Sequence, residues 1–120
     1  MKVRLKRVYE PKDGSDGLRI LVERLWPRGM TKEAAGVDIW LKEISPSPAL
    51  RRWYAHDEAK WPEFQRRYRA EIAANKEALA ELRKYCVNGA TFLFAAKDEK
   101  RNSAAVLKAY LENSTKEETA

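Results

Sequence analysis

Basic side chains gather in two short segments, each of which follows a candidate strand. Residues 23–29 hold Arg24, Trp26 and Arg28, and residues 97–102 lead into a candidate helix. An arginine side chain offers a planar fork that suits phosphate or carboxylate, and a helix N-terminus presents free N–H groups that favour anions. If the two strands are neighbours in a sheet, the pattern predicts an anion-binding site where the segments meet.

Each side chain in these segments has an expected role. The anion would be held by Arg24, Arg28 and Lys97, and it would be oriented by Asp98 and Asn102. The competing interpretation is that Arg24 forms a structural ion pair, because buried charges are usually paired. The candidate partners for such a pair are Glu23, Asp38 and Asp98.

The single histidine, His56, directly precedes Asp57. A neighbouring carboxylate can tune an imidazole as a general base, so His56 is a candidate catalytic residue together with Asp98. The alternative is an exposed imidazole that interacts with a helix C-terminus. The sequence supplies no third member of a catalytic set that would decide between these interpretations.

Metal and cofactor chemistry find little support in the residue types. The single cysteine, Cys86, falls on the apolar stripe of a long candidate helix, which is typical of a core position and not of an activated nucleophile. One cysteine and one histidine do not supply the ligands of a structural zinc site. No glycine-rich phosphate motif, serine nucleophile elbow or zinc-binding helix motif occurs, so we expect no metal and no cofactor.

Large aromatic side chains are numerous for 120 residues: four tryptophans and five tyrosines. Rings beside arginines can stack on nucleic-acid bases, although most such rings belong to the core. Trp26 is the exception of interest, because arginines flank it in a segment expected to be a loop. We therefore include Trp26 among the candidate ligand-binding residues.

Four segments are predicted to be extended. Residues 3–8 alternate apolar and charged side chains, which is typical of a half-buried strand. Residues 19–26 contain the apolar run 20–22, which indicates burial on both faces, as in a parallel sheet. Residues 37–44 also alternate, with a short helix as the alternative, and residues 91–96 form an apolar run that predicts a central strand.

Helical patterns lie between and after these strands. A short helical turn is expected at 31–35, and a helix is expected from Ser47 to about Ala55, with Ser47 as its N-cap. One long amphipathic helix is expected from near Pro62 to Cys86, and a last helix follows a cap at Asn102 or Ser103. Alternating strands and helices predict a three-layer α/β sandwich with a mainly parallel sheet, whose ligands collect at the carboxyl ends of the strands.

Composition limits the class of protein. Residues 1–113 are expected to form one domain, followed by a polar, flexible tail at 114–120. No apolar run reaches the length of a membrane span, and the N-terminus does not resemble a signal peptide, so we expect a cytoplasmic protein. The net charge is +6, and residues 1–32 hold nine Lys/Arg against four Asp/Glu. This basic excess can attract anions or simply aid solubility.

The sequence resembles the YeaO-like proteins, the family catalogued as domain of unknown function 488. The resemblance covers about Arg7 to Leu111 and rests chiefly on residues 16–29, DGLRILVERLWPRG. It extends to DIWLKE at 38–43, PS at 46–47, LRRWYAHD at 50–57, Trp61, Phe64, Tyr68, AKD at 96–98 and NSA at 102–104. The resemblance implies a compact three-layer α/β fold and no particular activity.

The resemblance also marks which polar positions belong to the family motifs. It places them at Arg24, Trp26, Arg28, Lys42, His56, Lys97, Asp98 and Asn102, and thereby adds Lys42 to the candidate ligand-binding residues. Where this chain has Ser103, family members often have histidine or asparagine. A mechanism that needs a histidine at that position would not apply to this chain.

Three functions follow from these observations. The first is the binding of a small anionic ligand, such as a phosphate, nucleotide or carboxylate, with or without catalysis. The second is a nucleic-acid-binding module that uses the basic N-terminal quarter, although no recognised nucleic-acid motif is present. The third is a protein-interaction domain without chemistry, which an exposed patch of tryptophans would favour.

Overall fold

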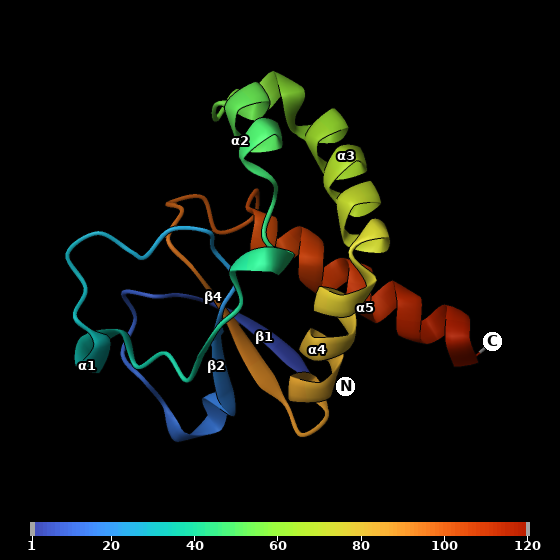
Figure 1. Cartoon of the computed structure of the whole chain (residues 1–120). Coiled ribbons are helices and arrows are strands. Elements are labelled where there is room, and N and C mark those ends of the chain that lie inside the picture. Colours follow the sequence, from blue (N-terminus) through green and yellow to red (C-terminus); the bar gives the residue numbers. More distant parts are fainter. Residues whose placement is uncertain (1, 120) are drawn as a thin grey trace.

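A parallel sheet organises the chain (Figure 1). The computed structural model describes the backbone of residues 2–119 and the side chains of residues 2–113. Within that part, four strands lie in the order β1–β4–β2–β3 and all neighbours are parallel. They are β1 (Val3–Arg7), β2 (Leu18–Leu21), β3 (Ile39–Trp40) and β4 (Ala90–Phe94). The α/β class with a parallel sheet and the central position of the last strand are confirmed.

The alternation of side chains gives the sheet two different faces. Val3, Ile20 and Phe92 point to one face and pack into the main apolar core. Leu21 and Leu93 point to the other face, where a smaller apolar cluster forms. Since Ile20, Leu21 and Val22 are all buried, the expected burial of this run on both faces is confirmed.

Helices cover the two faces unequally. The main core is closed by α3 (Trp61–Ala74), α4 (Lys76–Cys86) and α5 (Ser103–Thr119), which bury Tyr68, Leu82 and Leu107. The other face is covered by the one-turn helix α1 (Lys32–Ala35) and by the loops on either side of it. As a result, large side chains from those loops, including Trp26 and Trp40, complete the smaller cluster.

The second strand is shorter than the predicted 19–26. It ends at Leu21, which pairs with Leu93 of β4 and Trp40 of β3, and the Val22 N–H makes one further hydrogen bond, to the carbonyl of Leu93. The backbone carbonyl of Glu23 instead accepts a hydrogen bond of 2.7 Å from the Trp40 indole N–H. Leaving the sheet in this way directs residues 23 and 24 across its carboxyl edge.

The segment 37–44 also differs from the expected strand. Only Ile39 and Trp40 pair with β2, and residues Lys42–Ile44 form a 3-10 turn. The Ser45 N–H donates to the carbonyl of Lys42 and closes this turn. The first part of the segment is therefore a short strand, as predicted, and the second part adopts the helical alternative.

The long helix predicted from Pro62 to Cys86 is interrupted at Asn75, which has φ −92° and ψ 68°. Its side-chain amide donates a hydrogen bond of 2.8 Å to the carbonyl of Glu43, and this contact anchors the bend to the 3-10 turn. The break lets α4 pack on the sheet while α3 rises beyond the strand ends beside α2 (Pro48–Tyr54) (Figure 1). The predicted N-cap of α2 is confirmed, because the Ser47 hydroxyl accepts from the Leu50 N–H at 3.1 Å.

The polar tail expected at 114–120 has its side chains outside the described residues. In the described part of the chain, no helix combines the length and the apolar character that crossing a bilayer requires.

Candidate functional site

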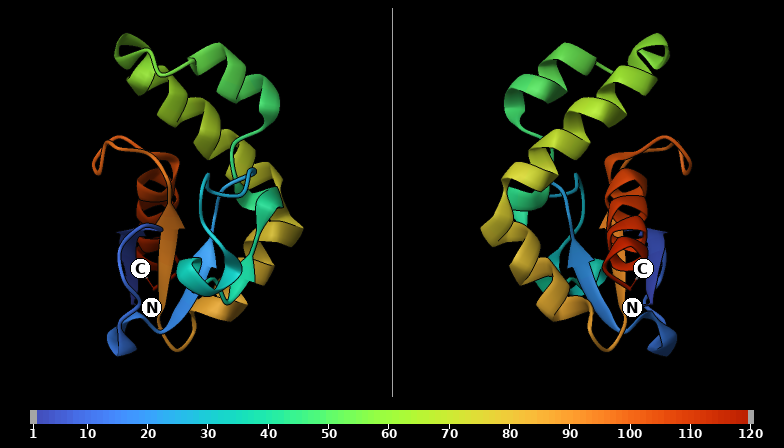
Figure 2. Two further views of the ribbon diagram at one scale, coloured as in Figure 1. Left: turned by 90° about the vertical axis from the view of Figure 1, so that its left-hand side faces the viewer. Right: turned by 90° about the vertical axis from the view of Figure 1, so that its right-hand side faces the viewer.

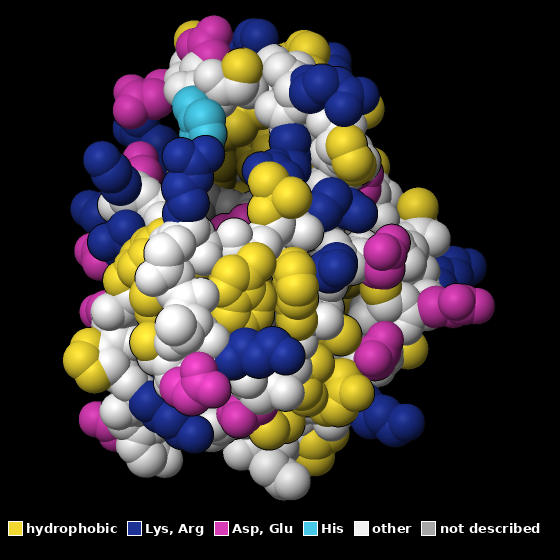
Figure 3. All heavy atoms as spheres, turned by 60° about the vertical axis from the view of Figure 1, so that its left-hand side comes forward, with side chains coloured by type: hydrophobic (Ala, Val, Ile, Leu, Met, Phe, Trp, Pro, Cys, Tyr) yellow, Lys and Arg dark blue, Asp and Glu magenta, His cyan; other side chains and the backbone are white. Residues whose placement is uncertain are grey.

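A cleft of about 610 Å³ opens at the carboxyl edge of the sheet. Figure 2 shows that helices α2 and α3 stand above the tips of the strands. Residues of α2, of α3 and of the loop between β4 and α5 line the cleft. Figure 3 shows the hollow beside the single histidine, with apolar side chains inside and cationic side chains around its rim. The carboxyl ends of parallel strands are where ligand sites are expected in α/β sheets.

Three of the predicted site residues line this cleft: Arg24, His56 and Asn102. The Arg24 guanidinium donates hydrogen bonds of 3.3 Å to the carbonyls of Ser45 and Pro46. Among the described residues it forms no ion pair with a carboxylate, so the structural ion pair considered for Arg24 is not formed. Arg24 thus fixes the wall of the cleft through backbone carbonyls and not through a direct ion pair.

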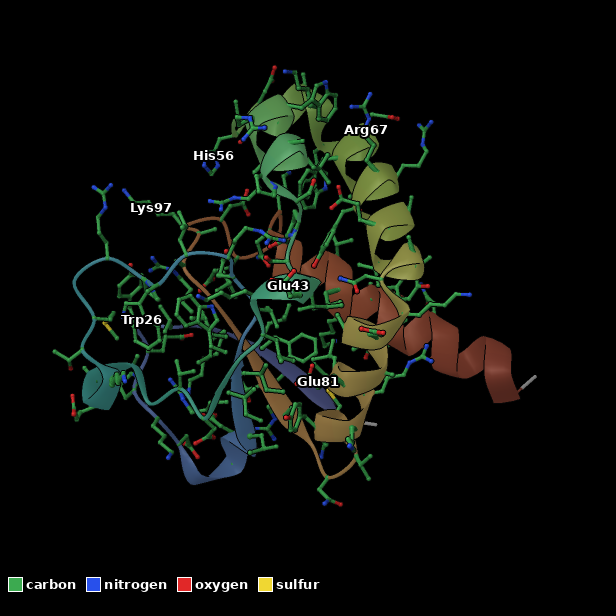
Figure 4. All side chains as sticks on the ribbon, viewed as in Figure 1. Trp26, Glu43, His56, Arg67, Glu81 and Lys97 are labelled. Carbon is green, nitrogen blue, oxygen red and sulfur yellow. The ribbon has the colours of Figure 1, made fainter. Side chains whose placement is uncertain are left out.

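His56 lies on the rim because the chain turns sharply after α2. Ala55 and His56 both have positive φ angles, 44° and 57°, and the Ala55 N–H donates to the carbonyl of Arg51 to close the helix. The imidazole is exposed, and its ring centroid lies 6.3 Å from that of Tyr54. In the view of Figure 4, His56 and Lys97 extend toward the same edge of the molecule.

Asn102 has a structural role as well as a place in the cleft. Its side-chain oxygen accepts from the Ala105 N–H at 2.8 Å, which makes it the N-cap of α5, and its amide donates to the carbonyl of Asp98 at 3.0 Å. Asn102 is buried, with 5% of its surface exposed, and its two hydrogen bonds determine where α5 begins. The first turn of that helix therefore faces the cleft, where Ser103 also lies.

Three more arginines line the cleft that were not predicted as site residues: Arg51, Arg52 and Arg101. Arg51 and Arg52 come from α2, and among the described residues neither guanidinium group forms a hydrogen bond or an ion pair. Arg101 pairs with the exposed Glu58 at 3.2 Å. In the sequence, two adjacent arginines on a short predicted helix that ends beside the single histidine could have suggested these site residues. The helix period alone, however, does not determine which way the arginine side chains point.

One carboxylate faces these cations. Glu23 lines the cleft, and its side-chain oxygen accepts from the Ala95 N–H at 3.2 Å. Burial raises the pKa of Glu23, while the bond from Ala95 and the charge of Arg51 act in the opposite direction. Four guanidinium groups and one carboxylate leave the cleft with a net positive charge, an arrangement that attracts anions.

Aromatic rings form the upper wall of the cleft: Tyr54 from α2, and Trp61 and Phe64 from α3. The Trp61 and Phe64 rings are stacked, with centroids 5.5 Å apart and an interplanar angle of 19°. The Tyr54 and Phe64 centroids are 4.5 Å apart. Burial, followed by the nearby charges of Asp98 and Glu58, raises the pKa of Tyr54, so its hydroxyl stays protonated.

Trp26 and Lys42 do not line the cleft. The Trp26 indole N–H donates a hydrogen bond of 2.7 Å to the carbonyl of Met30. The Trp26 ring packs edge-on against the Trp40 ring, with centroids 5.3 Å apart. Figure 4 shows Trp26 well away from His56. Lys42 is exposed and places its ammonium 4.1 Å from the centroid of the Trp40 ring. Trp26 is thus a packing residue, because the face of the sheet without long helices needs large side chains to cover it.

The expected convergence of Arg24, Arg28 and Lys97 is not found. Arg28 and Lys97 are exposed and neither lines the cleft with Arg24. Asp98 is also exposed, and its carboxylate accepts from the N–H groups of Lys100 and Arg101, each at 2.9 Å. These hydrogen bonds lower the pKa of Asp98, and the bond from the Arg101 N–H has the largest effect. Asp98 therefore remains ionised and holds the turn that precedes α5.

Elsewhere in the molecule, Cys86 is fully buried in α4, and burial raises its pKa to about 11. It does not line the cleft and stays protonated, in agreement with a core position. Among the described residues, no group of three His, Cys, Asp or Glu side chains is placed to hold a metal ion.

Comparison with known proteins adds family membership to this geometry. The family model described as "Inactive DUF488-N3 subclade" matches residues 2–120. The uncharacterized protein Rv3073c of Mycobacterium tuberculosis is 44% identical over 107 residues, which cover 88% of this chain and 90% of that protein. The uncharacterized protein YeaO of Escherichia coli is 40% identical over 114 residues, covering 92% and 97%. No solved structure matches the chain.

Proposed function

We propose a ligand-binding function for this chain, which belongs to the YeaO-like DUF488 family and matches its inactive DUF488-N3 subclade. In this proposal the cleft binds a small oxyanion, such as a phosphate or carboxylate group. The observation that carries it is the set of four arginines that line one cleft against a single carboxylate, Glu23. Guanidinium groups match the geometry of oxyanions, and among the described residues those of Arg51 and Arg52 form no competing hydrogen bond or ion pair.

The proposal is binding without turnover. The description of the subclade as inactive supports this choice. So does the use of Asp98, one of the two predicted catalytic residues, to hold the turn before α5. His56 remains at the rim, where it can add a hydrogen bond or a charge to the bound anion. The cytoplasmic location expected from the sequence is part of the same proposal.

The nucleic-acid alternative is the weaker of the two charge-based functions, because internal contacts use much of the basic N-terminal quarter. Arg19 is fully buried against Asp16. Lys6 contacts the same carboxylate at 3.2 Å, and Arg7 donates to the carbonyls of Ala95 and Ala96. Side chains held in this way contribute little to a phosphate-binding surface. The protein-interaction alternative stays a prediction that no observation favours, since the four tryptophans are half-buried.

The test is thermal unfolding in sulfate against sodium chloride of equal ionic strength. A ligand held at 100 times its dissociation constant stabilises the folded state by about 2.7 kcal/mol. We therefore expect the melting temperature to rise with sulfate concentration beyond the chloride control. The rise should be largely lost in a variant that carries Arg51→Gln and Arg52→Gln.

The matched control carries Arg66→Gln and Arg69→Gln, two exposed arginines of α3 that do not line the cleft. It changes the net charge by the same amount and should keep the sulfate response. Equal sulfate and chloride responses in the unmodified protein would overturn the proposal, as would equal losses in the two double variants.

A further inference from the structure

The aromatic wall of the cleft has more apolar surface than a bare oxyanion can use. Tyr54 and Trp61 are half-buried and face the cleft, while Phe64 behind them is 4% exposed. Pro46, Pro48 and Ala96 extend the apolar lining. Leaving such rings in contact with water is unfavourable, so their presence at a ligand site indicates that part of the ligand covers them.

The size of the cleft points in the same direction. Its volume of about 610 Å³ falls within the range of roughly 300–1,000 Å³ typical of sites for whole organic ligands. A sulfate or phosphate ion would fill only a small part of this space. The remaining volume would hold water against the rings.

The rings and the cations are arranged as neighbours. Arg51 and Tyr54 are three residues apart on α2, which places their side chains on the same side of the helix. The charge of Arg101 also acts on the Tyr54 hydroxyl across the cleft. A ligand with an anionic group at the arginines would therefore place the atoms next to that group against Tyr54 and Trp61.

We propose that the ligand is an oxyanion attached to a planar aromatic or heteroaromatic ring, with the ring lying against Tyr54 and Trp61; this inference rests on the proposed function. Flat rings stack on aromatic side chains with little dependence on the identity of the ring. The oxyanion, a phosphate or a carboxylate, is bound by Arg51 and Arg101 at the side of the cleft where α5 begins. The neutral Tyr54 hydroxyl is available to donate a hydrogen bond to the ligand.

Calorimetric titration with three phosphate monoesters tests this inference. Methyl phosphate carries the anion without a ring, cyclohexyl phosphate adds a puckered apolar ring, and phenyl phosphate adds a planar ring. We expect phenyl phosphate to bind at least tenfold more tightly than methyl phosphate, and more tightly than cyclohexyl phosphate. Parallel titrations with benzoate and acetate show whether the cleft prefers ring carboxylates to ring phosphates.

Variants locate the ring. Trp61→Leu and, separately, Tyr54→Leu should each reduce the preference for phenyl over methyl phosphate about threefold or more. The matched control is Trp53→Leu, because Trp53 lies on α2 beneath Arg67 and Lys60 and does not line the cleft. Two variants are used so that a folding defect in one leaves the other informative.

The outcomes separate the two proposals. Equal binding of phenyl and methyl phosphate would overturn the ring inference and leave the oxyanion function standing. Equal binding of phenyl and cyclohexyl phosphate would overturn the requirement for a planar ring. No binding of any phosphate or carboxylate would overturn the proposed function, and the ring inference with it.

Discussion

Glu23 is the residue on which the charge balance of the cleft depends. Among the described residues it is the one acidic side chain that lines the cleft, and it faces the same space as Arg24 and Arg51. Burial raises its pKa above the ordinary value of 4.5, because the charged form loses hydration there. An ionised Glu23 repels a bound anion, so it sets an upper limit on affinity and makes that affinity depend on pH.

We predict that Glu23→Gln binds sulfate roughly fivefold more tightly at neutral pH, which corresponds to about 1 kcal/mol for one charge removed at short range. In the unmodified protein the sulfate affinity should rise as the pH falls toward 4.5, because Glu23 takes up a proton above that value. The variant should lack this rise. The measurement is calorimetric titration with sulfate. Both the Glu23 protein and the Glu23→Gln variant carry His56→Gln in this experiment, so that no imidazole charge contributes.

Glu77→Gln, at an exposed position on α4, is the charge-matched control and should leave the affinity unchanged. A sulfate affinity that is the same in Glu23→Gln and Glu77→Gln would contradict the role given to Glu23.

At the scale of elements, the cleft depends on where α5 begins and on how α2 and α3 stand above the sheet. Asn102 fixes the first point through its bonds to Ala105 and Asp98. Asn75 fixes the second, because its bond to Glu43 holds the bend between α3 and α4. Asn102 acts as a helix cap, whereas Asn75 donates to a carbonyl of the 3-10 turn, so the site depends on polar side chains that satisfy backbone groups.

We predict that Asn102→Ala lowers the free energy of unfolding by about 1 kcal/mol, because the cap of α5 is lost. Asn102→Asp keeps an acceptor for the Ala105 N–H and should be the more stable of the two. It also adds a negative charge to the cleft and should therefore weaken sulfate binding severalfold. Urea unfolding and sulfate titration of both variants check this.

Thr31→Ala, which removes the cap of α1 on the other face of the sheet, provides the comparison. Thr31→Ala should lower the free energy of unfolding without changing the sulfate affinity. If Asn102→Asp bound sulfate as tightly as Thr31→Ala, Asn102 would have no place in a ligand site.

The sequence predicted these elements better than their arrangement. The cap at Ser47, the cap at Asn102 or Ser103 and the central strand followed from local patterns, because capping residues and apolar runs act over a few residues. The break at Asn75 was missed, since the apolar stripe continues through it and the partner that holds it, Glu43, is distant in sequence. That bend lets α3 stand beside α2 above the ends of the strands.

The sequence pointed to the carboxyl ends of the strands, where the cleft lies, and to some of the residues that line it. Arg24, His56 and Asn102 line the cleft, but Arg28 and Lys97 do not. The guides were proximity in sequence to a strand end and the family motifs, and neither determines the direction of a loop. Trp26 was taken for a ligand contact because arginines flank it, whereas it packs on a sheet face that has no long helix to cover it.

At the scale of the whole molecule, a buried ionic cluster stabilises that helix-poor face. Asp16 accepts from Arg19 at 2.6 Å and from Lys6 at 3.2 Å, and Arg19 donates further to the carbonyls of Ala35 and Gly36. The cluster thereby joins β1, β2 and α1. Burial opposes the ionisation of Asp16, but the hydrogen bonds from Asp13, Arg19 and Lys6 outweigh it and lower its pKa below 3.8.

Because the pKa of Asp16 is lowered in the folded protein, its contribution to stability is complete above pH 3.8 and is lost as the pH falls below that value. We predict that Asp16→Asn lowers the free energy of unfolding at pH 7 by about 3 kcal/mol, since it leaves Arg19 buried without its counter-charge. The difference from the unmodified protein should shrink on acidification. Urea unfolding between pH 3 and pH 7 measures this, and an unchanged stability of Asp16→Asn at pH 7 would contradict it.

The most direct test of the central claim is a crystal structure of the protein soaked in tungstate, a heavy oxyanion that anomalous scattering locates without ambiguity. We predict a peak in the cleft, within hydrogen-bonding distance of the guanidinium of Arg51, Arg52 or Arg101. Tungstate bound only elsewhere, for instance beside Lys2 and Arg4 at the opposite edge of the sheet, would contradict it.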